Sequence, residues 1–272
     1  MRAANRHLRL LLAGGLLLLA GCATPPTDPA ARAEFDATND PFEPTNRAIF
    51  GFNDWLDTWL FKPVAQSYEF VFPQFSRNIM RHFLDNLNEP VVFANDVMQM
   101  EFHRADVTAG RFLANTTIGF AGFFDIATST GLPEQTGDFG QTLYHYHFPE
   151  GPYLVLPVLG PSNPRDAIGI GVDGEIDPWG WLASGYGHGG ATWYRYIAWG
   201  VDERARNIQT IDSIKKSSLD YYAQMRSLFR QHRAAELNGG KPTPVKDLNS
   251  LYTDPGTRPQ TSLDLPVNKK QQ

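Results

Sequence analysis

Apolar residues return every three or four positions along much of the chain, and proline, glycine or polar residues interrupt this pattern repeatedly. A repeat of this period places the apolar side chains on one face of an α-helix. The pattern predicts helices over residues 45–61, 76–87, 104–117, 119–128, 165–172 and 194–233. We expect Pro63 and Pro73 to interrupt the early helices and Pro90 to open a separate short one. The last helix should break near 215–218, with a serine as the new cap.

The middle of the chain does not follow the helical period. Between residues 137 and 161, Leu143, Tyr144, Tyr146 and Phe148 mix alternation with β-favouring residue types, and residues 149–152 read as a turn. We therefore expect an extended hairpin or loop here. Because a loop of this length is unusual in a helical domain, it is expected to be functional.

The first 22 residues have the layout of a secretory signal. Three arginines precede an apolar run, Leu10–Ala20, that is too short to span a bilayer as a helix. The run ends in Leu-Ala-Gly21-Cys22, which resembles the signal of bacterial lipoproteins. We expect cleavage between Gly21 and Cys22 and acylation of the Cys22 thiol; an ordinary signal peptide with a chance cysteine is the alternative. Ala23, rather than aspartate, follows the cysteine, and by the same resemblance this points to the outer membrane.

Four segments follow from these patterns. Residues 1–21 are predicted to be the signal peptide, and residues 22–39, rich in proline, alanine and threonine, a tether. Residues 40–237 are predicted to be one folded domain. Residues 238–272 are poor in large apolar side chains and are expected to be a disordered tail.

Charge and composition exclude several classes of protein. The 272 residues carry 24 Lys and Arg against 29 Asp and Glu, a net charge of −5, which argues against a nucleic-acid partner. A single cysteine excludes an intrachain disulfide framework and a thiolate zinc cluster. An apolar fraction of 42% is enough to form a core.

Catalytic and metal-binding signatures are weak. The sequence has no G-x-S-x-G, no H-E-x-x-H and no glycine loop for phosphate. Asp138-Phe139-Gly140 spells a kinase triplet without its partner motifs, and His145 and His147 would share one face of a strand without a further ligand. Asp54 and Asp57 are better interpreted as the polar edge of a helix than as an acid/base pair. We therefore expect neither an enzyme nor a metal or other cofactor, apart from the covalent lipid on Cys22.

The helices are unusually apolar. Aromatic residues make up 12% of the chain, six of them Trp, and residues 49–60 and 119–128 have apolar side chains on more than one side. Such helices are either fully buried in a protein core or lie partly in a lipid leaflet, with Trp at the interface.

An ordered set of short segments carries a family resemblance. They are Asn39–Glu43, Asn46-Arg47, Phe52-Asn53, Lys62–Ala65, Asn86–Pro90, Gly110–Leu113, Asn115–Gly119, Gly122–Asp125, Asp138–Leu143, Gly151–Pro157, Gly160–Ser162 and Arg165-Asp166. Together they resemble the MlaA/VacJ family of outer-membrane lipoproteins. The resemblance implies a mostly α fold: a ring of short helices in the inner leaflet of the outer membrane, with a central channel and one extended hairpin.

The same resemblance implies function and partners. Phospholipid mislocalised in the outer leaflet would pass through the channel to a periplasmic carrier and on to an inner-membrane ABC transporter, and the protein would dock on a trimeric porin. The hairpin, about residues 128–161, would influence the channel, with Pro149 and Gly151 as controlling residues. Two departures stand out: Glu43-Pro44-Thr45-Asn46-Arg47 replaces the family's Glu-Gly-Phe-Asn-Arg, and Pro149 should stiffen a loop that is often glycine-rich in relatives.

Three functions remain open at this stage. The first is the phospholipid conduit, with Lys62, Arg111 and Asp125 predicted along the lipid path because charges in apolar helices need a partner or water. The second is a scaffolding lipoprotein of the envelope that binds porins. The third is a phospholipase, for which Ser162, His145 and Asp138 are the only nearby trio.

Overall fold

The computed structural model describes residues 27–28, 32, 38–187 and 191–238. This part of the chain is mostly helical, with one two-stranded sheet, as the sequence predicts. The expected signal peptide, Cys22 and the tail beyond Asn238 lie outside the described residues, as does most of the expected tether.

The first helical rod runs over Glu43–Leu56 (α3), the π-helical turn Asp57–Phe61 (η1) and Lys62–Val71 (α4). The expected interruption at Pro63 is wrong, because the rod passes through this residue. The wider π turn ends at Phe61, two residues before Pro63, and a wider turn relieves the clash of the proline ring with the preceding turn of the helix. Pro73 does end the rod, since it holds Phe72 in an extended conformation (φ −107°, ψ 117°).

The next helix, α5, runs unbroken over Gln74–Met98, so the predicted separate helices on either side of Pro90 are wrong. Proline removes one amide donor inside the helix. In the turn before it, the Leu87 carbonyl accepts hydrogen bonds from Trp179 Nε1 at 2.7 Å and Arg195 Nη1 at 3.1 Å. Tertiary donors from α10 and α11 therefore bond to this helix in the turn before Pro90.

The α6 helix, Phe102–Thr117, packs along α5 and leads to the short α7, Ile126–Ser129. The predicted helix over 119–128 is wrong, because Phe120, Ala121 and Gly122 all have positive φ (59°, 61° and 92°). Asn115 stabilises the turn: its carbonyl accepts from Gly122 N at 2.8 Å and its side-chain oxygen from Ala127 N at 2.9 Å.

The middle segment contains a helix that the sequence pattern does not predict. Asp138 caps α8, Phe139–His145, by accepting from Gln141 N at 2.9 Å. The hairpin itself is short: β1, Leu154–Leu156, pairs antiparallel with β2, Gly160–Ser162, with Val155 opposite Pro161. His145 ends α8 and His147 has φ 60°, so the expectation that they share a strand face is also wrong.

The C-terminal half is helical. It comprises α9 (Pro164–Ile176), α10 (Pro178–Gly185), α11 (Ala191–Arg206), α12 (Ile208–Ser217) and α13 (Tyr221–Leu237). The predicted break near 215–218 is present, but Asp220 rather than a serine caps the following helix, accepting from Ala223 N. A second break occurs at Asn207, whose amide donates to the Glu203 carbonyl at 3.0 Å and competes with the helical pattern.

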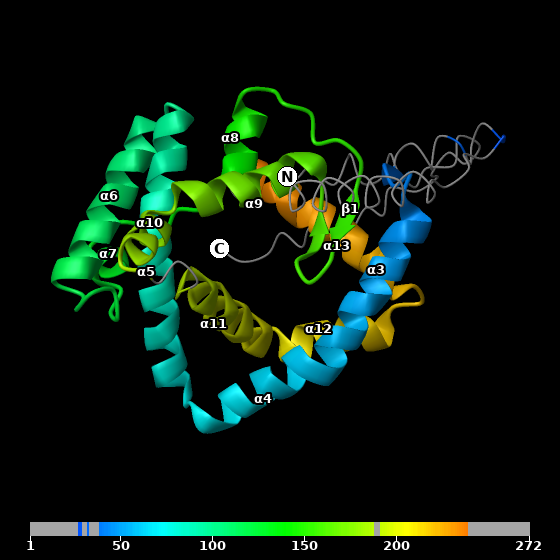
Figure 1. Ribbon diagram of the computed structural model, residues 1–272, viewed down its shortest axis with the longest axis horizontal. Coiled ribbons are helices and arrows are strands. Elements are labelled where there is room, and N and C mark those ends of the chain that lie inside the picture. Colours follow the sequence, from blue (N-terminus) through cyan, green and yellow to red (C-terminus); the bar gives the residue numbers. More distant parts are fainter. Residues whose placement is uncertain (1–26, 29–31, 33–37, 188–190, 239–272) are drawn as a thin grey trace, which may run out of the picture.

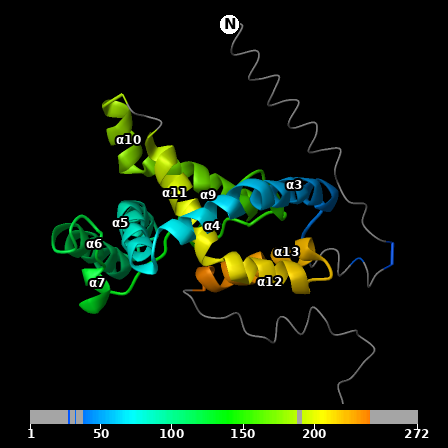
Figure 2. The same ribbon diagram turned by 90° about the horizontal axis from the view of Figure 1, so that it is seen from below.

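The helices are arranged in a ring (Figure 1): α3 and α4 form one side, α5 and α6 the opposite side, and α8 and α9 join them. Seen from below, the ring is flat, with α10 projecting from one face and α12 and α13 forming a layer on the other (Figure 2). A small apolar core of Tyr153, Val155 and Tyr222 lies where the hairpin and α13 meet, with Phe50 of α3 packed against it.

Candidate functional site

The buried and exposed side chains are distributed in the reverse of the usual pattern for a soluble protein. Among the described residues, the largest fully buried side chains are all polar or charged: Asn46, Asn95, Thr108, Asp40, Asp96 and Asp177. The buried apolar residues are mostly small, with alanine and valine prominent. Apolar burial therefore contributes little here, and buried hydrogen bonds and ion pairs connect the elements.

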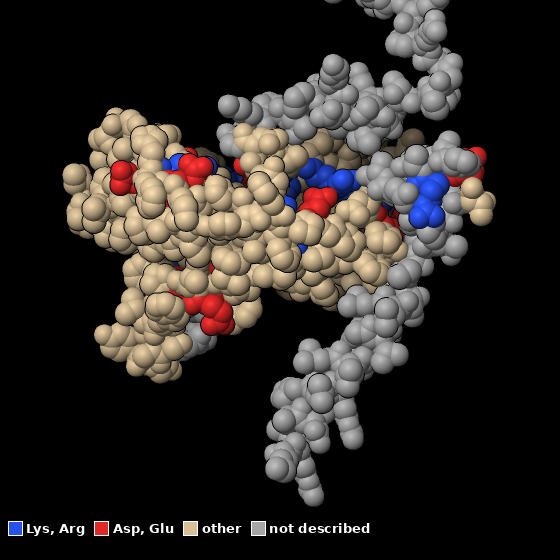
Figure 3. All heavy atoms as spheres, turned by 90° about the horizontal axis from the view of Figure 1, so that it is seen from above, with Lys and Arg blue, Asp and Glu red and all other residues tan. Residues whose placement is uncertain are grey.

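Large apolar side chains lie instead on the surface. We define the exposed apolar set as the following side chains, taken from the stretch α3 to α7 and from α10 and α11: Phe52, Trp55, Trp59, Leu60, Phe70, Phe72, Phe75, Phe102, Leu113, Ile118, Phe120, Phe124, Trp181, Leu182, Trp193, Tyr194 and Trp199. Phe70 is 92% exposed and Trp59 is 72% exposed. In Figure 3 uncharged residues cover most of the described surface, and charges gather in a few places. An apolar surface of this size marks contact with lipid or protein.

The rod of α3 and η1 shows this reversal within one element. Phe52, Trp55 and Trp59 follow helical spacing and are exposed. The polar residues point into the protein: Asp57 accepts from Arg204 Nε of α11 at 2.6 Å, and Asp54 pairs with Lys215 of α12. This confirms the interpretation of Asp54 and Asp57 as a polar helix edge.

Two asparagines of α3 hold the hairpin. Asn46 Nδ2 donates to the Tyr153 carbonyl at 3.0 Å, and its Oδ1 accepts from Val155 N at 2.9 Å. One heptad later, Asn53 makes the same pair of bonds with the Leu156 carbonyl at 2.9 Å and with Val158 N at 2.8 Å. The side-chain amides therefore act as a partner for the edge of β1 and fix the hairpin against the ring.

The structure brings two of the predicted lipid-path residues together. Arg111 of α6 donates to Glu89 of α5 at 2.8 Å and to the Leu132 carbonyl at 2.7 Å, and its Nη2 lies 3.5 Å from Asp125. Asp125 also caps α7. Burial raises the pKa of Glu89 to about 7, although Arg111 opposes this shift. Charges carried on α5, α6 and the turn before α7 are thus paired inside the protein.

Lys62, the third predicted residue, belongs to a different cluster. Its Nζ donates to both carboxylate oxygens of Asp212 on α12, at 2.9 and 2.8 Å. The pair is part-buried, and Arg204 lies 4.0 Å from the same carboxylate. The hydrogen bond from Lys62 lowers the pKa of Asp212.

A third cluster connects the middle of the chain to its last helix. Arg233 of α13 donates to Asp138 at the start of α8, at 2.7 and 2.8 Å, and to Asp166 of α9 at 3.0 and 2.9 Å. Partial burial would raise the pKa of Asp138, but the hydrogen bonds and charge of Arg233 outweigh it and lower this pKa. The kinase-like triplet is therefore a structural helix cap with an ion-pair partner.

The segment before the hairpin carries the two residues predicted to control it. Gly151 has φ 74°, and a Cβ there would lie 2.8 Å from Pro164 Cγ at the start of α9. Asn39 Nδ2 donates to the Gly151 carbonyl at 2.7 Å. Glycine is therefore required at 151, both for its positive φ and because a side chain would clash with Pro164. The bond from Asn39 and the contact with Pro164 fix this loop between the N-terminal segment and α9.

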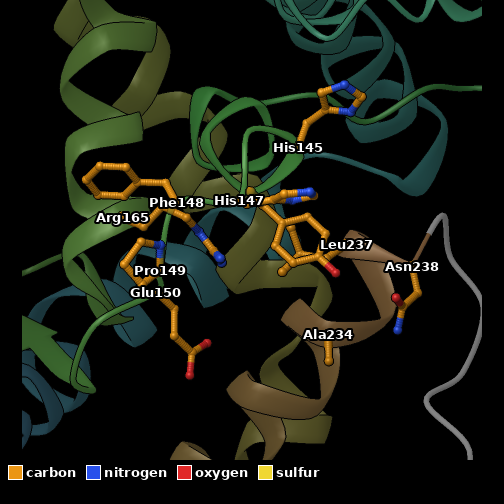
Figure 4. A pocket seen from close by; sticks show the side chains of 10 residues that line it. His145, His147, Phe148, Pro149, Glu150, Arg165, Ala234, Leu237 and Asn238 are labelled. Carbon is orange, nitrogen blue, oxygen red and sulfur yellow. The ribbon is translucent and has the colours of Figure 1, made fainter.

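Pro149 lines an open pocket of about 890 Å³ between α8, the loop, α9 and the end of α13 (Figure 4). Tyr144, His145, His147 and Phe148 form one wall, Ala234, Leu237 and Asn238 another, and Glu150 and Arg165 the rest. Arg165 extends toward the middle of the pocket. Its chemistry is therefore mixed, with aromatic and aliphatic walls and one charge of each sign.

Other candidate chemistry is not assembled in the described residues. They contain no group of three or more His, Cys, Asp or Glu able to hold a metal ion. Ser162 donates to the Asn163 carbonyl at 3.3 Å and Asp138 pairs with Arg233, so His145 joins neither in a hydrogen bond or ion pair. No helix of this part is both long and apolar enough to cross a membrane.

Sequence reasoning missed Asn46, Asn53, Arg165 and Arg233 as site residues. The two asparagines were detectable in principle, because they recur seven positions apart and so lie on the same side of the helix. Arg233 was not, since nothing in the spacing shows that α13 returns to α8 and α9.

Comparisons with known proteins agree with this architecture. The family profile of the MlaA lipoproteins matches residues 38–236. The chain also matches a solved structure, with a TM-score of 0.63 and 28% identity over 73% of this chain and 99% of that one. That structure was solved as the structural basis for maintenance of bacterial outer membrane lipid asymmetry.

Sequence relatives cover most of both chains. The chain is 33% identical over 247 residues to the intermembrane phospholipid transport system lipoprotein MlaA of Escherichia coli K12, covering 88% of this chain and 92% of that protein. It is 31% identical over 211 residues to the protein of the same name from Haemophilus influenzae, covering 75% and 81%. An uncharacterized protein of Rickettsia prowazekii is 33% identical over 198 residues, covering 72% and 76%.

Proposed function

Because this chain belongs to the MlaA lipoprotein family, we propose that it is the lipoprotein of an intermembrane phospholipid transport system and maintains the lipid asymmetry of the outer membrane. The observation that carries the proposal is the reversed distribution of polarity. Its largest fully buried side chains are polar and its large apolar ones are exposed on the helices that form the ring.

This distribution suits a protein lying in one leaflet. Transfer of the exposed Trp and Phe side chains from water into the acyl chains is favourable. The buried ion pairs keep the charged groups out of the acyl chains. A flat ring without a membrane-crossing helix among its described residues is compatible with the inner leaflet of the outer membrane. The expected acyl group on Cys22 would hold the protein there from the periplasmic side, as the dominant anchor.

Within the ring, we assign a conduit for phospholipid. A headgroup moving through hydrocarbon loses its water, which costs several kcal/mol unless polar groups replace it. Lys62, Arg111 and Asp125 are proposed to contribute to this polar path. Lipid taken from the outer leaflet would leave toward a periplasmic phospholipid carrier, and the apolar surface would also dock on a trimeric porin.

The proposed activity is transfer without catalysis. Direction would come from removal of lipid by the downstream carrier and transporter, so this chain needs no nucleotide site. The loop containing Pro149 and Gly151 is proposed to influence passage, because Asn39, α3 and α9 fix its position relative to the ring.

The test is the amount of phospholipid in the outer leaflet of cells with and without this gene. Deletion should raise that amount, and the intact gene should restore it. The Cys22→Ala variant should fail to restore it if the acyl anchor is needed, while Arg47→Ala, which changes an exposed ion pair, should succeed.

An unchanged amount of outer-leaflet phospholipid after deletion, in a strain without a second copy of the gene, would reject transport. The scaffolding alternative would then be favoured. It predicts that porin complexes lose this protein as a partner while lipid asymmetry stays intact.

A further inference from the structure

The pocket beside the hairpin contains a charged side chain whose hydrogen bonds are incomplete. Arg165, at the start of α9, is 2% exposed. Its Nε donates to Asp166 at 3.2 Å, but its Nη2 is buried without a hydrogen-bond partner within the described part of the chain. A buried guanidinium normally satisfies all its donors, because an unpaired one costs free energy.

Neighbouring charges do not supply the missing partner. Asp166 also accepts two hydrogen bonds from Arg233, and Arg233 forms a second ion pair with Asp138. The Tyr144 ring lies over the Arg165 guanidinium, with 5.4 Å between the guanidinium carbon and the ring centroid. Tyr144 is itself exposed, and it lines the same pocket as Arg165.

The remaining walls indicate what kind of molecule fits. The guanidinium fork matches the oxygens of a phosphate, and the start of α9 adds positive potential. Phe148, Leu237 and Ala234 offer apolar surface beside it. Glu150, at the rim, supplies one carboxylate, which Asn39 Nδ2 approaches to 3.5 Å and Arg230 Nη2 to 3.9 Å on one oxygen. Its other oxygen would attract an amine, and the carboxylate would repel a second negative charge.

We propose that this pocket binds the phosphate-bearing headgroup of a phospholipid, with Arg165 on the phosphate and Glu150 on the amine of a zwitterionic, ethanolamine-type headgroup. The proposal rests on the proposed transport of phospholipid and specifies a headgroup site for it. Apolar side chains at the mouth receive the glycerol end and the first part of the acyl chains. The site therefore prefers phosphoethanolamine over phosphoglycerol headgroups.

The test is calorimetric titration of the purified full chain in a maltoside detergent with glycerophosphoethanolamine, glycerophosphoglycerol and inorganic phosphate. We expect glycerophosphoethanolamine to bind most tightly. Arg165→Gln should weaken its binding at least about tenfold, since a charge-assisted pair is lost. Glu150→Gln should remove the preference over glycerophosphoglycerol.

Two further variants make the result independent of folding defects at a buried arginine. Ala234→Trp fills the pocket from α13 without changing Arg165 and should also abolish binding. His232→Trp adds the same ring to an exposed position on the same helix and should leave binding unchanged.

Unchanged affinity in both Arg165→Gln and Ala234→Trp would overturn the proposal. Equal affinity for inorganic phosphate and glycerophosphoethanolamine would also overturn it, because the site would then recognise free phosphate. These outcomes leave the cellular measurement of lipid asymmetry untouched, so failure of the headgroup site and failure of the transport function are distinguishable.

Discussion

Arg111 is 3% exposed, and its guanidinium is shared among Glu89, Thr128 and the Leu132 carbonyl. Replacing it with methionine would leave the Glu89 carboxylate buried without its cation. Breaking a buried pair from one side costs about 3–5 kcal/mol. We therefore expect Arg111→Met to lower the free energy of unfolding by up to about that amount at a pH above 7, where Glu89 is ionised, measured by denaturant unfolding in detergent.

Arg47 provides the matched control. It forms ion pairs with Glu43 and Asp220, but these side chains are all exposed. Exposed pairs contribute about 0–1 kcal/mol. Arg47→Met should therefore change the unfolding free energy little, and an equal loss in the two variants would show that burial does not set the strength of the Arg111 pair.

Glu89 gives a prediction about pH. Burial raises its pKa to about 7, and Glu134 and Asp85 raise it further against the opposing effect of Arg111. The folded state then holds this proton more tightly than the unfolded state, whose pKa is near 4.5. The contribution of Glu89 to stability is present below pH 4.5 and is lost as pH rises toward 7, by up to about 1.4 kcal/mol per pH unit.

The measurement compares Glu89→Gln with the unaltered chain at several pH values between 5 and 8. Glutamine cannot titrate, so the stability of the variant should fall less steeply over this window. Parallel curves for the two proteins would mean that Glu89 has the same pKa in the folded and unfolded states. Asp85, whose pKa burial raises to about 6, titrates in both proteins and contributes to the slope of both curves.

At the scale of elements, two glycines set the crossing of α8 and α9. A Cβ at Gly169 would lie 2.6 Å from Gly140 N, so the backbones approach too closely for any side chain. Gly171, on the same helix, has nothing within 4 Å of its would-be Cβ. Gly169→Ala should destabilise the protein by about 1–3 kcal/mol through overpacking. Gly171→Ala should stabilise it by about 0.5–1 kcal/mol, because alanine favours helix.

Thermal unfolding of the two variants checks this prediction. Opposite shifts of the melting temperature are expected, with Gly169→Ala lower and Gly171→Ala higher than the unaltered chain. A lower melting temperature in both would mean that any side chain on α9 is unfavourable, whatever its contact with α8.

The elements show where sequence patterns suffice and where they fail. Periodicity locates α3 and the helices after residue 190, because local spacing determines those faces. It fails at Pro90, where donors from Trp179 and Arg195 arrive from distant helices. It fails also at 119–128, because an apolar run reads as a helix while the positive φ of Phe120, Ala121 and Gly122 excludes one.

The site was predictable to the same extent. Helices with more apolar faces than a core can bury indicate contact with a lipid leaflet. This signal lies within the sequence of each single helix, so it can be recognised without knowing the fold. Pairing is not local: Lys62 pairs with Asp212, 150 residues away, and Asp138 with Arg233, 95 residues away. Nothing in residue type or spacing shows which charges end up paired inside the ring and which, like Arg165, keep an unused donor.

At the scale of the whole molecule, polarity is opposite to that of a water-soluble domain, and the two halves of this reversal support each other. Hydrogen bonds and ion pairs between the helices allow the exterior to be apolar. They are needed because, in lipid, a charge without a partner cannot be solvated by water. The ion pairs of α5, α6, α11 and α13 would be poor sources of stability in water, yet they connect elements that share little apolar contact area.

This reversal predicts the behaviour of the mature chain without its acyl group. Burying one Trp or Phe in a leaflet is worth about 1.5–3 kcal/mol. In a Cys22→Ala background, Trp59→Glu and Phe70→Glu should each reduce co-flotation with phospholipid vesicles by about tenfold or more. Leu219→Glu is the control: Leu219 is 108% exposed but lies in the turn between α12 and α13, in the layer displaced from α3 and α4 (Figure 2). If Leu219→Glu reduces flotation as much as the other two, the layer of α12 and α13 contacts lipid as well, and the ring lies deeper in the leaflet than the exposed apolar set alone requires.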